Sequence, residues 1–264
     1  MFYRELLLPP LARSAAFCAW HFELEDGDPP IVQHSIPPDG TTNFALVRTD
    51  QGEQLAVLVG PSLVAHQLPV TRGWRYCGLR LRPEAVRALL GRVPAPGERD
   101  MLARGDRHEP IWRGLESMLA GCEDWSGTMA YFATSAAPDP AVRAAVDWIV
   151  ASGGMAPLAQ LARLAGLSER QFRRRFVAAT GIAPKFYADV QRIRRALILS
   201  LEDPSWAGVA AEAGYADQPH LVREVKGRFG AAPRQVGGYF RGMRHQLIAF
   251  EPVRFVQDAE AHAA

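Results

Sequence analysis

The chain has 264 residues, which is enough for two domains, and hydrophobic residues make up 48% of it, which is enough for a buried core. No uncharged apolar run approaches the ~20 residues of a membrane-spanning helix, and Glu5 lies where a secretory signal would be basic, so we expect a cytoplasmic protein. Residues 150–245 carry 15 Lys and Arg against 7 Asp and Glu, which leaves the remainder acidic although the whole chain is only +2. A basic C-terminal third is typical of a polyanion-binding region.

The N-terminal half reads as strands followed by helices. Short apolar or aromatic runs alternate with clusters of Asp, Gly and Pro, which is the pattern of strands joined by turns. The sequence predicts strands at 17–24, 42–47, 54–59 and 74–81. Apolar stripes at helical spacing then predict helices at 83–91 and 110–120.

A Pro- and Ala-containing stretch at residues 135–140 is the best candidate for a linker. Asp139 is a preferred N-cap and Pro140 suits the first position of the helix that follows. We therefore expect an N-terminal effector-binding or dimerisation domain, a DNA-binding domain and a tail, with the boundaries 1–134, 139–241 and 242–264.

A helix-turn-helix pattern begins in the basic third. Residues 158–165 read as a short helix, Gly166 permits the left-handed backbone of a tight turn, and Ser168 caps a second helix. On this second helix Phe172 and Phe176 share one face, and arginines occupy the opposite face. Buried aromatics behind exposed arginines are the layout of a recognition helix, which enters the DNA major groove.

The same pattern recurs about 48 residues later. Ala162 and Gly166 correspond to Ala210 and Gly214, and Asp217 takes the place of the serine cap. The second recognition helix has Leu221 and Val225 as its inward positions, and each unit ends in Gly-x-x-Pro, at 181–184 and 230–233. Such self-similarity indicates a duplicated unit.

A helix is predicted from about Pro184 to Leu201, between the two units. At ~1.5 Å per residue it is about 27 Å long. Its predicted buried stripe is Phe186, Val190, Ile193, Leu197 and Leu201. Such a helix can hold two recognition helices about one DNA turn apart, so that one polypeptide reads two successive major grooves.

Together these landmarks resemble the DNA-binding domain of the AraC/XylS family of transcription regulators, over residues 139–241. The positions that carry the resemblance are Leu161, Ala162, Gly166, Ser168, Phe176, Gly181, Pro184, the run 192–196, Val209, Ala210, Gly214, Tyr215, Asp217, Arg223, Lys226, Gly230 and Pro233. Leu221 and Val225 depart from it, because the family has phenylalanine there. The fold class implied is α+β: a β-rich, barrel-like N-terminal domain with helices, then an all-α domain of two helix-turn-helix units joined by a linker helix.

The resemblance also places the contacts to double-stranded DNA. Base-reading positions fall on Arg170, Arg173 and Arg174 in the first unit and on Gln218, Pro219, Val222 and Arg223 in the second. Pro219 and Val222 cannot donate to a base, so we expect the first helix to read sequence and the second to anchor phosphates. The expected backbone contacts are Lys185, Lys226, Arg228, Ser168 and His220, with a capping role as the alternative for His220. Arg192, Arg194 and Arg195 either contact DNA or pair with Asp189, Glu202 or Asp203.

The N-terminal half resembles the small β-barrel sensor domains that precede AraC-type DNA-binding domains. This implies a small-molecule effector or a second copy of the chain as a partner, besides RNA polymerase. Trp20, Trp74 and Tyr76 are candidates for an apolar effector pocket, with a place in the core as the alternative. The histidines His21, His34 and His66 lack the spacing of a metal-binding barrel, so we expect no metal or other cofactor.

Two other functions stay open: an enzyme targeted to DNA, and a DNA-binding or dimerisation module that responds to no ligand. An enzyme is disfavoured because no nucleophile with a nearby base can be found and no reactive-cysteine or four-cysteine motif is present. Cys18, Cys77 and Cys122 are expected to be free thiols of a reducing compartment. We therefore expect no catalytic residues.

Overall fold

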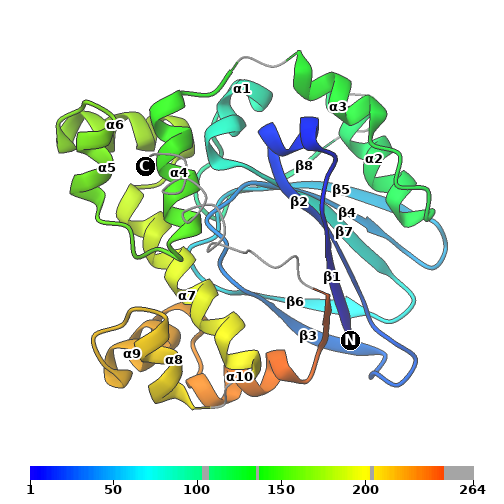
Figure 1. The fold of residues 1–264 in the computed structure, drawn as a ribbon. Helices are drawn as coiled ribbons and strands as arrows, with labels where there is room; N and C mark the ends of the chain where they lie inside the picture. Colours follow the sequence, from blue (N-terminus) through cyan, green and yellow to red (C-terminus); the bar gives the residue numbers. More distant parts are fainter. Residues whose placement is uncertain (103–106, 135–136, 203–204, 247–264) are drawn as a thin grey trace.

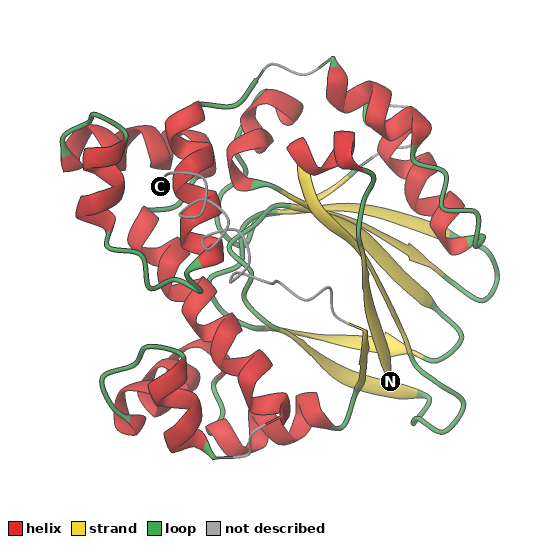
Figure 2. Cartoon of the chain, viewed as in Figure 1, coloured by secondary structure: helices red, strands yellow, loops and turns green. Residues whose placement is uncertain are grey.

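The computed structural model describes residues 1–102, 107–134, 137–202 and 205–246. It has a β-rich N-terminal part with helices and an all-helical C-terminal part, so the expected α+β class is confirmed (Figures 1 and 2). Residues 135 and 136 of the expected linker, and the tail from residue 247 on, lie outside the described residues.

Seven strands form the main sheet, in the order β8-β5-β4-β7-β2-β1-β9. Their bounds are β1 Phe2–Leu6, β2 Ala16–Glu23, β4 Asn43–Arg48, β5 Gln54–Val59, β7 Arg75–Leu81, β8 Arg99–Met101 and β9 Arg244–Gln246. All neighbours are antiparallel except β1 and β9, where the last described strand of the chain pairs in parallel with the first.

A separate antiparallel ribbon of two strands, β3 (Ile31–Ile36) and β6 (His66–Thr71), faces the main sheet (Figure 1). Strands β8 and β9 end the main sheet at opposite edges and do not pair with each other. The expected barrel-like arrangement is therefore an open one.

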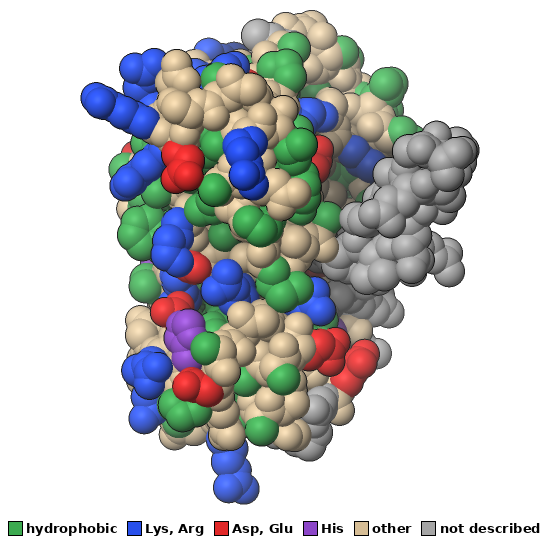
Figure 3. Space-filling view, turned by 60° about the vertical axis from the view of Figure 1, so that its left-hand side comes forward, with side chains coloured by type: hydrophobic (Ala, Val, Ile, Leu, Met, Phe, Trp, Pro, Cys, Tyr) green, Lys and Arg blue, Asp and Glu red, His purple; other side chains and the backbone are tan. Residues whose placement is uncertain are grey.

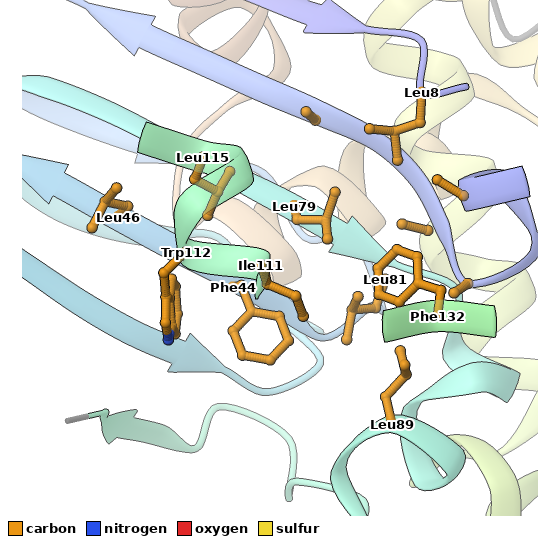
Figure 4. Close-up of a cluster of buried hydrophobic side chains, with 14 of the residues drawn as sticks. Leu8, Phe44, Leu46, Leu79, Leu81, Leu89, Ile111, Trp112, Leu115 and Phe132 are labelled. Atoms are coloured by element: carbon orange, nitrogen blue, oxygen red, sulfur yellow. The ribbon is translucent and has the colours of Figure 1, made fainter. Parts of the chain in front are cut away.

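Short helices cover one face of the main sheet, which we call the outer face. They are the 3-10 turns η1 (Pro10–Ser14) and η2 (Pro83–Ala85) and the helices α1 (Val86–Leu90), α2 (Glu109–Leu119) and α3 (Ser126–Ala133). Phe44 packs edge-on against Trp112, 4.9 Å between ring centroids, and both side chains are fully buried (Figure 4). Large apolar side chains at alternate strand positions make this the core of the N-terminal part.

The C-terminal part consists of two helical units at the two ends of one long helix, α7 (Figure 1). The helices are α4 Pro140–Ala151, α5 Leu158–Leu164, α6 Glu169–Thr180, α7 Pro184–Glu202, α8 Trp206–Glu212, α9 Gln218–Phe229 and α10 Pro233–Arg241. Asp139 caps α4 by accepting hydrogen bonds from the Ala141 and Val142 amides, as its position before Pro140 predicts. Among the described residues, no helix is both long and apolar enough to cross a membrane.

Candidate nucleic-acid interface

The first helix-turn-helix unit consists of α5 and α6. Gly166, with φ of 65°, makes the turn between them, and Leu167 donates its amide to the Ala162 carbonyl at 3.0 Å. Ser168 and Gln171 form a reciprocal capping box at the start of α6. Phe172 and Phe176 are 2% and 0% exposed, so the aromatic face of α6 is turned inward as the sequence predicts.

The second unit repeats this geometry with α8 and α9. Gly214 has φ of 74°, and Tyr215 donates its amide to the Ala210 carbonyl at 2.9 Å, as the equivalent residues do 48 positions earlier. Asp217 caps α9 by accepting from the His220 amide at 2.6 Å. Leu221 and Val225 are both fully buried, so aliphatic side chains fill the place that phenylalanines fill in the first unit. The two units are therefore structural repeats.

The exposed face of α6 is rich in arginine. Arg170, Arg173 and Arg174 are exposed, and none of the three makes an ion pair within the described residues. Arg175 differs, because its guanidinium lies 2.7 Å from the carboxylate of Asp139. A cation without an internal ion pair can donate to an external acceptor, and contact between these three arginines and DNA stays a prediction.

The exposed face of α9 carries fewer cations. Gln218, Arg223 and Lys226 are exposed, and neither cation has an internal ion-pair partner in the described part of the chain. Figure 3 shows Lys and Arg side chains projecting from both the upper and the lower unit on this side of the molecule. The basic surface therefore extends over both units.

Several expected phosphate contacts have partners inside the protein. Lys185 lies 3.4 Å from Asp189, and the Ser168 hydroxyl serves the cap of α6. The His220 ring packs edge-on against Tyr215 at 5.2 Å. Arg228 is only 13% exposed and donates to the carbonyl of Leu63 in the N-terminal part at 2.7 Å. Contact between Arg228 and DNA would therefore require this bond to open.

The connecting helix α7 has 19 residues, about 28 Å at 1.5 Å per residue. Val190, Ile193 and Leu197 are buried as predicted, but Phe186 is 53% exposed, so its assignment to the buried stripe is wrong. The neighbouring Tyr187 is fully buried instead. It packs where the loop at Gly40 approaches α7, a contact with the N-terminal part that helical periodicity alone does not reveal.

Two of the three arginines of the linker helix have partners within the protein. Arg192 pairs with Asp189, which was one of the predicted alternatives, and Arg194 pairs with a residue that the sequence did not suggest. Arg192 lies 3.8 Å from Asp189 and donates to the Gly154 carbonyl at 2.9 Å. Arg194 lies 4.0 Å from Glu5 of β1. These pairings tie α7 to its surroundings.

The N-terminal part holds both units through polar contacts. Arg87 donates to the carbonyl of Ala178 near the end of α6, at 2.8 and 3.0 Å from its two nitrogens. At the other unit, Tyr239 of α10 bonds through its hydroxyl to Nδ1 of His34 at 2.7 Å. Sequence reasoning missed these contacts because no local pattern marks two residues some 90 or 205 positions apart. The relative placement of the recognition helices thus depends on the N-terminal part as well as on α7.

His34 is buried, with its ring stacked on Phe22 at 4.1 Å between centroids. Burial lowers the pKa of His34 to about 4, because the protonated ring would lose its hydration. His34 is therefore a neutral hydrogen-bonding group at neutral pH. His21 of β2 lies on the outer face of the main sheet, on the opposite side of that sheet from Phe22, and is next to Glu23. His66 is the first residue of β6.

The three aromatic residues considered for an effector pocket belong to the inner face of the main sheet, opposite α2. The Trp20 indole donates to Asn43 at 3.3 Å, and the Tyr76 hydroxyl accepts from the Thr71 amide at 2.9 Å. Trp74 lies 6.5 Å from Tyr76 between ring centroids. These rings pack against one apolar cluster, and a role in effector binding stays a prediction.

The cysteines make no disulfide in the structure. Cys18 and Cys77 are buried and Cys122 is exposed. Burial raises the pKa of Cys18 to about 12, which suppresses the reactive thiolate.

Comparison with known proteins identifies the helical units. The family described as helix-turn-helix domain matches residues 161–237, a range that begins within α5, spans α6 to α9 and ends within α10. No curated protein matches the chain. Among solved structures, the chain is similar to an AraC-type transcriptional regulator from Chromobacterium violaceum, at 25% identity and a TM-score of 0.35, covering 38% of this chain and 90% of that one.

Two further solved structures are similar. The DNA-binding domain of AdpA in complex with a target DNA is 26% identical, with a TM-score of 0.37, and covers 39% of this chain and 96% of its own. ToxT from Vibrio cholerae is 10% identical, with a TM-score of 0.44, and covers 83% of this chain and 96% of its own. The family match and the repeated geometry of α5–α6 and α8–α9 lead to one conclusion: the chain contains a helix-turn-helix domain at residues 161–237.

Proposed function

We propose that this protein is a sequence-specific transcription regulator whose two recognition helices, α6 and α9, read successive major grooves on one side of the duplex. The observation that carries the proposal is the repeat itself: two units with the same turn geometry lie at opposite ends of α7. Each has cations on its exposed helix face that make no ion pair with another described residue. A separation of ~34 Å joins successive turns of the same groove. A helix about 28 Å long with a unit at each end is of the right size for this span.

The two recognition helices, α6 and α9, are proposed to make different kinds of contact with DNA. Arg170, Arg173 and Arg174 are the proposed base readers of α6, since an arginine can donate two hydrogen bonds to guanine O6 and N7. On α9, Gln218 and Arg223 are proposed to reach bases, and Lys226 is proposed to neutralise a phosphate. Lys185, Ser168, His220 and Arg228 are the further proposed backbone contacts.

The N-terminal part is proposed to modulate DNA binding, by binding a small-molecule effector or a second copy of the chain. The protein is proposed to be cytoplasmic, to act with RNA polymerase and to have no catalytic role. Contacts such as Tyr239–His34 and Arg228–Leu63 support this modulation, because they link the second unit directly to the N-terminal part. A change in that part therefore bears on the position of α9. Residues 1–134 and 139–241 are the proposed domains.

Groove spacing provides the test. Duplexes that bind the full-length protein are selected from a random pool, and five base pairs are then inserted between the two contacted half-sites of the best one. Insertion of half a turn moves one groove to the opposite side of the duplex, so we expect loss of at least tenfold in affinity. An insertion of ten or eleven base pairs restores the side but separates the two grooves by about two turns, ~68 Å, which the ends of α7 do not span, so affinity stays low. Equal affinity for all three duplexes would contradict reading by two units.

A further inference from the structure

The outer face of the main sheet has an uncovered end. Helix α2 packs over the middle of this face and ends at Leu119, whose carbonyl accepts a hydrogen bond from Arg75 at 3.1 Å. Beyond that point four basic side chains occupy neighbouring positions on β1, β2, β4 and β7: Arg4, His21, Arg48 and Arg75, which we call the basic hollow. None of them belongs to the helical units.

Pairing of the strands places two of these arginines next to each other on the sheet. Arg48 of β4 and Arg75 of β7 are directly opposite each other in the antiparallel register and therefore lie on the same face. Like charges at such positions repel and destabilise the pair. Within the described residues, neither makes an ion pair, and Arg48 has no hydrogen-bond acceptor from the protein.

Two more nitrogens of the basic hollow lack a partner. Nε of Arg4, a donor, and Nε2 of His21, a donor in one of the two ring tautomers, are buried and have no hydrogen-bond partner in the described part of the chain. His21 is 9% exposed, and the nearest carboxylate, that of Glu23, is 3.7 Å from Nε2, beyond hydrogen-bond distance. Glu123 is 3.9 Å from Arg4 and half exposed. A buried donor without an acceptor is costly, so the site favours a bound acceptor.

Open space adjoins these side chains on both sides of Arg75. A hollow of about 450 Å³ is lined by Arg48 and Arg75 together with Gly73 and residues of the β4–β5 turn, including Asp50. A second of about 210 Å³ is lined by Arg4, His21 and Arg75 and by Glu23, which lies opposite Arg75 on β2. Met118 and Leu119 add apolar surface to the second. The space suits a small molecule with anionic oxygens and a short carbon skeleton.

We propose that the basic hollow binds a small organic oxyanion, a metabolite whose phosphate or carboxylate oxygens accept from Arg48, Arg75, Arg4 and His21. Guanidinium groups donate to such oxygens in a bidentate manner, and an anion placed between Arg48 and Arg75 removes their repulsion. The site goes beyond DNA binding, and it lies on the opposite face of the sheet from Trp20 and Tyr76.

Calorimetric titration of the full-length protein with inorganic phosphate and with citrate, at constant ionic strength, tests the proposal. We expect one saturable site for at least one of the two probes and a loss of tenfold or more in affinity in Arg48→Gln and in Arg75→Gln. Arg113→Gln is the matched control, because Arg113 is an exposed arginine of the same part of the chain outside the hollow. Arg173→Ala separates this site from phosphate attracted to α6.

A thermal melt without probe shows that the variants are folded. Removal of one like charge should leave the melting temperature of Arg48→Gln unchanged or raise it. The proposal is overturned if neither probe binds the wild-type protein, if all four variants bind equally, or if only Arg173→Ala loses binding. Failure of DNA binding would leave it intact, since Arg48→Gln does not alter the helical units.

Discussion

At the scale of single residues, DNA recognition depends on which cations on the helix surfaces are available to contact the duplex. Arg173 and Lys226 are exposed and make no ion pair among the residues that the structure describes, whereas Arg175 forms an ion pair with Asp139. Arg173→Ala should relax the preference at one base position, by about 1–3 kcal/mol, because a bidentate base contact is lost. Lys226→Ala should weaken binding to all duplexes and lower the salt slope by about one unit.

Fluorescence anisotropy with a set of single-base variants of the selected duplex measures both effects. Arg175→Ala is the control on α6, and its base preferences should match those of the wild-type protein. Uniform weakening by both Arg173→Ala and Lys226→Ala would show that α6 does not read sequence.

His34 gives a pH dependence of stability whose sign follows from its burial. The folded-state pKa is about 4 and the unfolded reference is 6.5, so the unfolded chain binds a proton first as the pH falls. Stability is therefore at its full value above about pH 6.5 and is lost between there and pH 4. The expected loss is about 2 kcal/mol between pH 7 and pH 5, at 1.4 kcal/mol per pH unit below 6.5.

Urea unfolding at pH 7 and pH 5 checks this for the wild-type protein and for His34→Gln. The variant should be less stable at pH 7, because its bond to Tyr239 is altered, and should lose less stability on acidification. An equal loss in the two proteins would mean that His34 does not govern the acid side of the stability curve.

At the scale of elements, the pattern of apolar and polar residues predicts a helix or strand where residues close in sequence determine which side chains are buried. Strands β2, β4, β5 and β7 and helices α1, α2 and α5–α9 follow the predicted runs. Strand β6 was not predicted, because Pro69 interrupts its run and cannot donate to a sheet. The pairing of β9 with β1 joins opposite ends of the chain and has no local signature.

In the candidate DNA-binding site, too, some features are predictable from the sequence and others are not. Spacing on α6 and α9 predicts which side chains are inward and which are outward, since the helical period alone decides this. It does not predict that Arg228 bonds to Leu63 or that Tyr187 replaces Phe186 in the core, because both depend on the N-terminal part packing on the helices.

The two neighbouring aromatics of α7 therefore make a matched pair. Tyr187→Ala should destabilise the protein by about 3–5 kcal/mol, because it empties a fully buried site between α7 and the N-terminal part. Phe186→Ala should cost less than about 1 kcal/mol, because the side chain is half exposed. Chemical denaturation measures the free energy of unfolding of both variants. A larger loss of stability for Phe186→Ala than for Tyr187→Ala would support the buried stripe predicted from the sequence.

At the scale of the whole molecule, both helical units are in contact with the N-terminal part. The buried cluster of the first unit consists of helical residues with Phe17 and Leu63 packed against it, whereas the second unit shares its cluster with Phe22 and Tyr76 of the main sheet. The proposed boundary before residue 139 predicts that a fragment that begins at residue 137 is soluble, helical and able to bind DNA. We expect it to be less stable than the same helices in the full chain, because Tyr187 and Tyr239 lose their partners. Circular dichroism and DNA binding measure this, and an unfolded fragment would contradict the proposed domain boundary.

The most direct test of the central claim is the binding of the full-length protein to DNA. The purified protein is titrated against a fluorescent duplex from upstream of its own gene and against a scrambled duplex, at two salt concentrations. Sequence reading by a basic surface predicts tighter binding to the native duplex, with both affinities falling as salt rises because phosphate contacts release counterions. Absence of binding to either duplex at low salt would contradict the account.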